Sequence, residues 1–339
     1  MALNHFYLFL HSQRKKGMEE LVAQLVEQYT FNVWALGSSP SQFTKSLSKL
    51  LRFFLFYLVI SPFTFTYFCN MNNFFKNKTV AVTGGSDGIG KALVEILLKA
   101  GAKVSTCGRN SEKLELLKTE NNNLPLHTCI ADVSVYDDCK NFINSTINTF
   151  GEIDILINNA GISMHGELKD TDISVFEKVM AINYFGTVYC TKLALDSILK
   201  TKGTIVGVSS IAGYRGLPGR SGYSASKFAL NGWLEAVRTE LMTEGVNVMW
   251  VCPGFTKSNI RNVALNEKAQ AQGESPLDES SLMTSEVCAQ EILNAIEKRK
   301  RTLVLTFKGK QTVFMNKFFA KLTDKLTHNF FYKNGKLIK

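Results

Sequence analysis

The sequence has little from which to build a metal site or a disulfide framework. Its seven cysteines include no C-x-x-C pair, and its five histidines lie far apart with no ligand spacing. This pattern predicts no bound metal. It also favours a reducing, cytoplasmic setting in which the thiols stay free.

Acidic residues are scarce at the C-terminal end. The 339-residue chain has a formal net charge of +10, and from Lys298 onward ten Lys and two Arg face one acid, Asp324. The rest of the chain is therefore close to neutral. This distribution predicts a local basic tail, and it argues against a nucleic-acid partner.

Long apolar runs are also scarce, and residues 50–69 form the only one long enough to span a membrane. One interpretation of residues 1–70 is an N-terminal extension with a single-pass anchor at 50–69, the alternative to a cytoplasmic location. The other is that translation starts at Met71. Residues 21–41 can be back-translated into a string with the three paired arms of a lysine tRNA gene. The DNA sequence of the gene decides between the two interpretations, because different codons over 21–41 would exclude the tRNA origin.

From Met71 onward, short β-rich runs alternate with helical patterns. This alternation predicts an α/β fold: a single Rossmann-like domain with a doubly wound parallel sheet in three layers, over residues 71–310. A polar, irregular stretch at about 255–285 is expected to form a substrate lid. The predicted strands are Thr79–Thr83, Lys103–Cys107, Leu126–Ile130, Ile153–Asn158, Gly203–Ser209, Asn247–Cys252 and Thr302–Leu305.

Residues 311–339 form a basic amphipathic tail. Large apolar residues recur every four positions from Phe314 to Phe330, and Lys317, Lys321 and Lys325 run beside them. The periodicity predicts one amphipathic helix. We favour packing of this helix on the lid or on a neighbouring subunit, and peripheral contact with an anionic membrane is the alternative.

A glycine cluster follows the first predicted strand. Gly84, Gly88 and Gly90 are spaced G-x-x-x-G-x-G between the strand and a helix. Glycines in this context let the backbone approach a pyrophosphate, which the helix N-terminus attracts. The cluster therefore predicts a dinucleotide site.

The spacing of these glycines resembles the short-chain dehydrogenase/reductase family, and later motifs extend the resemblance. In chain order these are Asp132-Val133, Asn158-Asn159-Ala160-Gly161, Asn183, Ser210, the Y-x-x-x-K pair Tyr223 and Lys227, and Pro253-Gly254-Phe255-Thr256. The resemblance implies that Asn183, Ser210, Tyr223 and Lys227 are catalytic. It implies cofactor contacts from Gly84, Ser86, Asp87, Gly88, Ile89, Gly90, Arg109, Asp132, Val133, Asn159, Ala160, Gly161, Tyr223, Lys227, Pro253, Gly254 and Thr256.

The resemblance also implies a role for each catalytic residue. Tyr223 protonates the carbonyl oxygen as hydride arrives, and Ser210 orients that oxygen. Lys227, one helical turn after Tyr223, is expected to lower the pKa of the phenol and to hold the cofactor ribose. Asn183 is expected to hold a water that links Lys227 to solvent.

The end of the second predicted strand bears on cofactor choice. Enzymes that use NAD place an acid there for the ribose 2′-hydroxyl. This chain has Gly108 at that position and Arg109 next to it, which favours NADP(H) over NAD(H). The competing interpretation is that Arg109 is a solvated residue at the start of the next helix.

The sequence therefore predicts an NADP(H)-dependent oxidoreductase that reduces a ketone or aldehyde, or oxidises the alcohol, by hydride transfer. The residues expected beside the substrate lean apolar and favour a lipophilic substrate such as a 3-oxoacyl chain, a long-chain keto-lipid or a steroid-like ketone; they are Ser163, Met164, Leu217, Phe255, Ile260 and Val263. A non-catalytic NADP(H)-sensing regulator is the alternative. A homodimer is expected through the helices that carry Asn183 and Tyr223.

Overall fold

The computed structural model describes residues 73–273 and 282–338. The apolar run at 50–69, the tRNA-like segment at 21–41 and part of the predicted lid lie outside these ranges. Within them, no helix has both the length and the apolar character needed to cross a bilayer.

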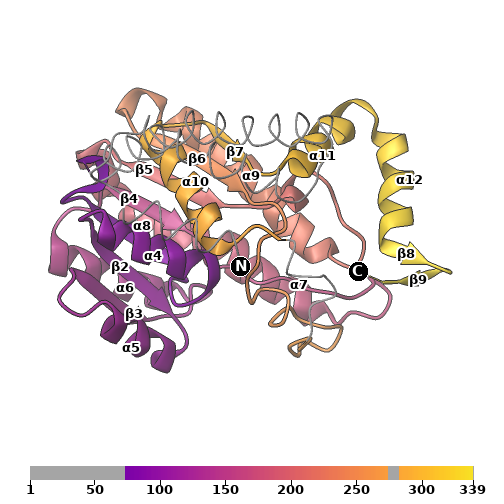
Figure 1. Ribbon diagram of the computed structural model, residues 1–339, viewed down its shortest axis with the longest axis horizontal. Coiled ribbons are helices and arrows are strands. Elements are labelled where there is room, and N and C mark those ends of the chain that lie inside the picture. The colour runs from indigo at the N-terminus through magenta and orange to yellow at the C-terminus, as the bar shows by residue number, and fades with distance from the viewer. Residues whose placement is uncertain (1–72, 274–281, 339) are drawn as a thin grey trace, which may run out of the picture. The chain divides into compact units, whose positions relative to one another are not determined.

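Seven parallel strands form one sheet in the order β3-β2-β1-β4-β5-β6-β7 (Figure 1). This arrangement confirms the predicted Rossmann-like α/β fold, and each predicted strand boundary lies within two residues of the observed one. The strands are β1 (Thr79–Thr83), β2 (Lys103–Gly108), β3 (Leu126–Ile130), β4 (Ile155–Asn158), β5 (Thr204–Val208), β6 (Asn247–Cys252) and β7 (Thr302–Val304).

Helices cover both faces of the sheet because its strands alternate apolar side chains between the two. In β1, Val80 and Val82 join one apolar cluster, whereas Ala81 joins the other. The first cluster includes residues of α4 (Gly88–Lys99), α5 (Ser111–Glu120) and α10 (Ser285–Glu297). The second includes residues of α6 (Tyr136–Phe150), α7 (Ile173–Met180), α8 (Gly186–Thr201) and α9 (Ser221–Glu240).

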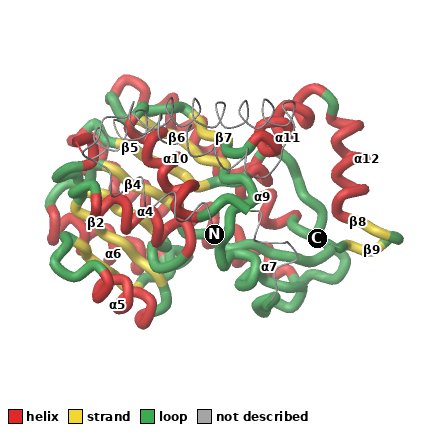
Figure 2. Tube along the Cα trace, in the orientation of Figure 1, coloured by secondary structure: helices red, strands yellow, loops and turns green. Residues whose placement is uncertain are grey.

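The strand order reverses between β1 and β4, and this switch point places the ligand crevice. In open α/β sheets the crevice opens outside the carboxyl ends of the strands where the order reverses. The turn from β1 into α4 and the segment after β4 both lie there. Figure 2 shows the loops that connect the strands to the surrounding helices.

The turn from β1 into α4 needs its glycines for different reasons. Gly84 and Gly88 have φ angles of +69° and +52°, in the left-handed region that favours glycine. A Cβ on Gly90 would lie 2.1 Å from the Gly84 carbonyl oxygen and 2.5 Å from the Asn159 Nδ2. The side chain of Asn159 donates to the carbonyl oxygens of Thr83 (2.9 Å) and Gly84 (3.1 Å), which ties this turn to the end of β4.

Helix α9 begins at Ser221. Ser221 and Gly222 carry no strong helix signal, but a Cβ on Gly222 would lie 2.9 Å from the Met164 Sδ. The close approach of Met164 from the segment after β4 therefore fixes the first turn of α9. It also makes Met164 a fully buried packing residue, not the substrate-facing one that was expected.

The basic tail forms two helices instead of the one predicted. Helix α11 (Phe307–Phe318) and helix α12 (Ala320–Phe331) are separated by Phe319, whose φ of −132° is not helical. A two-stranded hairpin follows, β8 (Tyr332–Lys333) and β9 (Lys336–Leu337). The break lets the chain turn back onto the domain instead of continuing as one rod.

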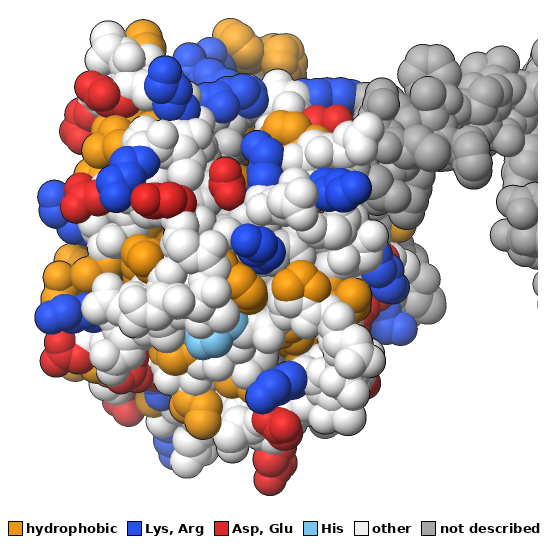
Figure 3. Space-filling model, turned by 90° about the vertical axis from the view of Figure 1, so that its left-hand side faces the viewer, with side chains coloured by type: hydrophobic (Ala, Val, Ile, Leu, Met, Phe, Trp, Pro, Cys, Tyr) orange, Lys and Arg blue, Asp and Glu red, His pale blue; other side chains and the backbone are white. Residues whose placement is uncertain are grey.

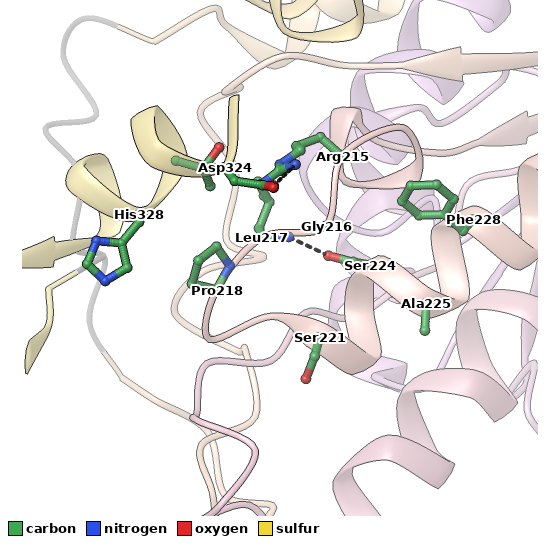
Figure 4. A pocket seen from close by; sticks show the side chains of 11 residues that line it. Arg215, Gly216, Leu217, Pro218, Ser221, Ser224, Ala225, Phe228, Asp324 and His328 are labelled. Atoms are coloured by element: carbon green, nitrogen blue, oxygen red, sulfur yellow. Dashed lines mark hydrogen bonds and ion pairs between the residues drawn. The ribbon is translucent and has the colours of Figure 1, made fainter. Parts of the chain in front are cut away.

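The two tail helices contact the loop before α9. Asn316 of α11 donates from its side chain to the Tyr214 carbonyl oxygen at 2.8 Å, and Asp324 of α12 pairs with Arg215 at 2.7 Å. Figure 4 shows this pair above a cavity of about 470 Å³ that α12 shares with the loop at 215–218 and the outer side of α9. The tail is therefore packed against the loop that precedes Tyr223.

We expect Gly90→Ala to destabilise the protein by about 1–3 kcal/mol, because the new methyl group has no room beside the Gly84 carbonyl and must displace the turn. The control is Gly232→Ala in the interior of α9, where a Cβ would meet nothing within 4 Å. That change should be neutral or stabilise by about 1 kcal/mol. Urea unfolding of the two variants measures the difference, and equal stabilities would contradict the packing described for Gly90.

Candidate active site

Tyr223 and Lys227 lie one turn apart at the start of α9, on the same helix face. The Lys227 Nζ is 5.8 Å from the centroid of the Tyr223 ring and donates to the Val208 carbonyl oxygen at 2.8 Å. Lys227 is 4% exposed, whereas Tyr223 is half-buried. The structure thus brings the predicted pair together.

The pKa values of this pair differ from the sequence expectation. Burial raises the pKa of Tyr223 above its usual value of 10, and the side chains of Ser210 and Arg220 act in the opposite direction. Burial lowers the pKa of Lys227 to about 8. The expected lowering of the Tyr223 pKa by Lys227 is therefore not observed, because desolvation dominates at the phenol and the ammonium is directed at Val208.

Ser210, and not Ser209, has the position to act with Tyr223. Ser209 is buried, at 4% exposure, whereas Ser210 is half-buried and follows the carboxyl end of β5. The Ser210 hydroxyl accepts a hydrogen bond from the Ala212 backbone N–H at 3.1 Å, and Ser210 lowers the pKa of Tyr223.

Asn183 lies in a π-helical turn, Ala181–Phe185, between α7 and α8. Such turns are rare in proteins, but many of those that occur lie at functional sites. The Asn183 side chain accepts from the Ile162 N–H at 2.8 Å and donates to the Ile162 carbonyl oxygen and to the Ser226 Oγ, both at 2.9 Å. Because these bonds use the acceptor and both donor hydrogens, the side chain is suited to holding the segment after β4 against α9.

The segment after β4 passes close to the catalytic pair. A Cβ on Gly161 would lie 3.1 Å from the Asn183 Oδ1 and 3.4 Å from the Lys227 Nζ. The backbone N–H groups of Asn159 and Ala160 each donate to the Thr83 Oγ1 at 3.0 Å. The predicted Asn-Asn-Ala-Gly motif thus joins the glycine-rich turn to the residues around Lys227.

The far end of the crevice has charges of both signs. Arg109, after β2, lies 3.7 Å from the Asp132 carboxylate, and Asp132 also accepts from the Ser134 N–H and hydroxyl. Asp87 caps α4 by accepting from the Gly88 N–H, and it pairs with Lys113 of α5. Lys113 was not predicted as a site residue from the sequence. Its position in the first turn of the helix after Arg109 was the signal that could have identified it.

The other predicted cofactor residues differ in burial and in the kind of side chain that they present. Val133 is buried against Gly186, and Ile89 is half-buried in the first turn of α4. Gly254 approaches Thr306 so closely that a Cβ would lie 2.5 Å from the Thr306 Cγ2, and Thr256 is 4% exposed. Pro253 and Ser86 are half-buried at the carboxyl ends of β6 and β1.

Across the two described ranges, no three Asp, Glu, His or Cys side chains gather as ligands for a metal ion. All six described cysteines are free thiols. The polar chemistry of the crevice is carried by hydroxyl, amide, ammonium, guanidinium and carboxylate groups. These groups, with the close-packed glycine turn, suit a dinucleotide pyrophosphate and a carbonyl oxygen.

Comparisons with known proteins agree with this geometry. The family model described as short chain dehydrogenase matches residues 78–269. Dehydrogenase/reductase SDR family member 7B of Xenopus laevis is 35% identical over 67% of this chain and 73% of its own length. A Dictyostelium discoideum protein, Dehydrogenase/reductase SDR family protein 7-like, is 32% identical over 76% of this chain and 82% of its own.

A solved structure shares the fold. It is a short chain dehydrogenase/reductase from Burkholderia phymatum in complex with NAD, with a TM-score of 0.65 and 21% identity over 73% of this chain and 95% of that one. The sheet order, the motif residues at its carboxyl edge and the family match lead to one conclusion. The chain belongs to the short-chain dehydrogenase/reductase family and is an oxidoreductase acting on CH–OH or C=O groups with NAD(P).

Proposed function

We propose that this protein reduces a lipophilic ketone or aldehyde with NADPH, using Tyr223, Ser210, Lys227 and Asn183. The observation that carries the proposal is the convergence of Ser210 and the Tyr223–Lys227 pair at the carboxyl edge of the sheet, beside the strand-order reversal. When bound, the nicotinamide supplies the hydride. The chain's own residues bind and orient the carbonyl and supply the proton.

Tyr223 is suited to be the acid. Its raised pKa keeps the phenol protonated at neutral pH, so it holds the proton that a reduced carbonyl oxygen requires. Ser210 donates to the same oxygen and orients it. Alcohol oxidation needs the phenolate instead, so at neutral pH the raised pKa favours reduction.

Lys227 and Asn183 support the acid in different ways. With a pKa of about 8, the Lys227 ammonium is charged at neutral pH and suits a ribose hydroxyl as acceptor. Asn183 holds the backbone of Ile162 and the hydroxyl of Ser226, which immediately precedes Lys227 in α9. We assign the proton relay to a water molecule bound near Asn183. The Asn183 side chain itself has a positioning role.

The preference for NADPH rests on two cations at the adenosine end of the crevice. Arg109 and Lys113 are 57% and 46% exposed, and Gly108 leaves no acid for a 2′-hydroxyl. A 2′-phosphate would accept from both cations. The Burkholderia phymatum structure was solved with NAD, so the choice between the two cofactors needs a direct measurement.

The lipophilic substrate is supported by apolar side chains that remain exposed near the crevice. Phe255 and Val263 of the lid are 42% and 43% exposed, and Leu217 lies in the loop before α9. Large apolar side chains grouped at a site entrance favour an apolar ligand. The non-catalytic regulator remains the alternative, and it predicts cofactor binding without turnover of any carbonyl.

We also propose a homodimer through α8 and α9, in a cytoplasmic setting. Phe185, just before α8, and Phe228 of α9 are 44% and 46% exposed, which suits a second copy. On the side of the domain that carries α5 and α6, basic and acidic side chains are interspersed instead (Figure 3). Sedimentation equilibrium would reveal a monomer if the dimer proposal is wrong.

The tail helices support a third proposal, peripheral contact with an anionic membrane. Phe314, Phe318, Phe319, Leu322 and Leu326 are each 48–60% exposed. Lys317, Lys321 and Lys325 are exposed beside them. Exposed aromatic residues next to lysines are typical of interfacial helices.

Tyr223→Phe should lower the turnover of a medium-chain ketone by roughly 100- to 10,000-fold, because it removes the transferable proton. Its affinity for NADPH should stay within about twofold, since the ring remains. Tyr136→Phe, an exposed tyrosine at the start of α6, is the control and should keep full activity. NADPH oxidation measures both variants, and full turnover by Tyr223→Phe would exclude Tyr223 as the acid.

Arg109→Met and Lys113→Met should each weaken NADPH binding by about tenfold and leave NADH binding unchanged, because only NADPH carries the 2′-phosphate. Lys118→Met, at the other end of α5, is the matched control. Fluorescence titration gives both dissociation constants. A wild-type protein that binds NADH more tightly would overturn the cofactor preference and leave the fold untouched.

Replacing Lys317, Lys321 and Lys325 with Glu should reduce binding to phosphatidylserine vesicles by roughly fivefold or more per lysine. The same exchange at Lys99, Lys118 and Lys140, which are exposed elsewhere, is the control. Vesicle co-sedimentation measures the bound fraction. If the variant with Glu at Lys317, Lys321 and Lys325 binds vesicles as well as wild type, the tail helices do not contact the membrane.

A further inference from the structure

The loop at residues 211–220 connects Ser210 to Tyr223 along the chain. It starts as a 3₁₀ turn, in which the Gly213 N–H donates to the Ser210 carbonyl oxygen at 2.9 Å. This turn lies directly on α9, because a Cβ on Gly213 would be 2.8 Å from the Lys227 carbonyl oxygen. The position of the turn on α9 therefore sets where Ser210 lies relative to the Tyr223–Lys227 pair.

The C-terminal tail packs on both ends of the 211–220 loop. At the first end, a Cβ on Gly309 of α11 would lie 2.9 Å from the Ile211 Cδ1, one residue after Ser210. At the other end, a Cβ on Gly219 would lie 2.5 Å from the Leu337 Cδ2 of β9. Both glycines are buried, so the tail and the loop are in close contact at these two points.

Between these ends, polar side chains join the tail to the loop. The Asn316 side chain of α11 donates to the Tyr214 carbonyl oxygen at 2.8 Å and accepts from the Arg215 Nη1 at 3.0 Å. The same Nη1 lies 2.7 Å from the Asp324 carboxylate of α12 (Figure 4). The Arg215 side chain is only 15% exposed, so its bonds are less screened than those of a surface pair. One guanidinium thus ties both tail helices to the loop.

Asp324 has a distinct place in the charge pattern of the tail. It is the only acidic residue after Lys298 in the sequence. Its carboxylate is directed at the loop through Arg215, whereas the neighbouring Lys321 and Lys325 are exposed. The loop is also held from the sheet, because the Tyr214 hydroxyl accepts from the Trp250 Nε1 of β6 at 2.9 Å. The loop is therefore fixed between β6 and the tail.

We propose that three side chains are positioning residues for the reaction: Arg215, Asn316 and Asp324. They hold the 211–220 loop on α9, so that Ser210 stays where it orients the carbonyl oxygen. The proposal rests on the reductase function, because it assigns these residues an effect through Ser210. A misplacement of about 1 Å in a reacting group can cost roughly 100-fold in rate, so contacts remote from the substrate can matter.

The test measures reduction of a medium-chain ketone by variants of the full chain. Arg215→Met and Asn316→Leu keep most of the side-chain volume and remove the polar contacts. Each should lower kcat by about 5- to 50-fold, because Ser210 is no longer held in its reactive position. The KM for the ketone should change by about threefold or less, and the affinity for NADPH by about twofold or less.

Two conservative variants test whether the ion pair itself acts. Arg215→Lys keeps the positive charge and should lose about threefold or less in kcat, well below the loss in Arg215→Met. Asp324→Asn should lose about two- to fivefold, a smaller effect because Asp324 is 65% exposed. If Arg215→Lys loses as much kcat as Arg215→Met, the charge does not hold the loop and the assignment of Asp324 is wrong.

Arg301→Met is the matched control. Arg301 pairs with Glu235 of α9 at 2.8 Å, so its loss breaks an ion pair of similar length between α9 and the segment after α10, outside the loop. It should leave kcat unchanged. Wild-type kcat in both Arg215→Met and Asn316→Leu, or an equal loss in Arg301→Met, would overturn the positioning role.

Hydrogen exchange tests the tail contacts independently of turnover. The N–H groups of Gly213, Tyr214 and Arg215 are bonded within the loop, and mass spectrometry of a peptide that covers them follows their opening. Exchange should be about tenfold faster or more in Arg215→Met and unchanged in Arg301→Met. Unchanged exchange in Arg215→Met would overturn the proposal even if wild type turns over no ketone and the reductase function fails. Faster exchange with undiminished kcat would also overturn it, because the loop would then be free to move without effect on the reaction.

Discussion

The close contact between the β1–α4 turn and the end of β4 is the constraint on which the crevice depends. Gly90 approaches the Gly84 carbonyl oxygen so closely that no other residue fits, and the Asn159 side chain bonds to the same carbonyl. Thr83 accepts from the backbone of Asn159 and Ala160 on the other side. This cluster holds the two strands in register where the strand order reverses, and it leaves the N-terminus of α4 open toward the crevice.

The active site is built outward from that cluster, and its electrostatics follow from burial. The segment after β4 continues from Ala160 past Gly161 to Ile162, which Asn183 holds through both backbone groups. Lys227 lies beneath this segment with its ammonium on the Val208 carbonyl oxygen. Desolvation lowers the pKa of the ammonium and raises the pKa of the phenol, so at neutral pH the pair is a charged ammonium beside a protonated phenol.

Much of the site could be predicted because it depends on local backbone requirements and on fixed motif spacing. Short β-rich runs between helical patterns predicted the strands, and the positions of Tyr223 and Lys227 on one turn follow from helix geometry. The sign of the Tyr223 pKa shift could not be predicted, because it depends on how completely the ring and the ammonium are desolvated. Lys113 was missed for a related reason. It approaches the crevice through a contact between distant segments, that of α5 with Asp87.

By itself the sequence determined the layered α/β fold and the family, since periodicity and motif order depend on residues close together in the chain. Only the tertiary structure decided that the tail breaks at Phe319 and folds back, because its contacts with Tyr214, Arg215 and Glu167 join residues more than 100 positions apart. It also decided the charge state of the catalytic pair. Burial and long-range charge are properties of the packed chain, and no local pattern encodes them.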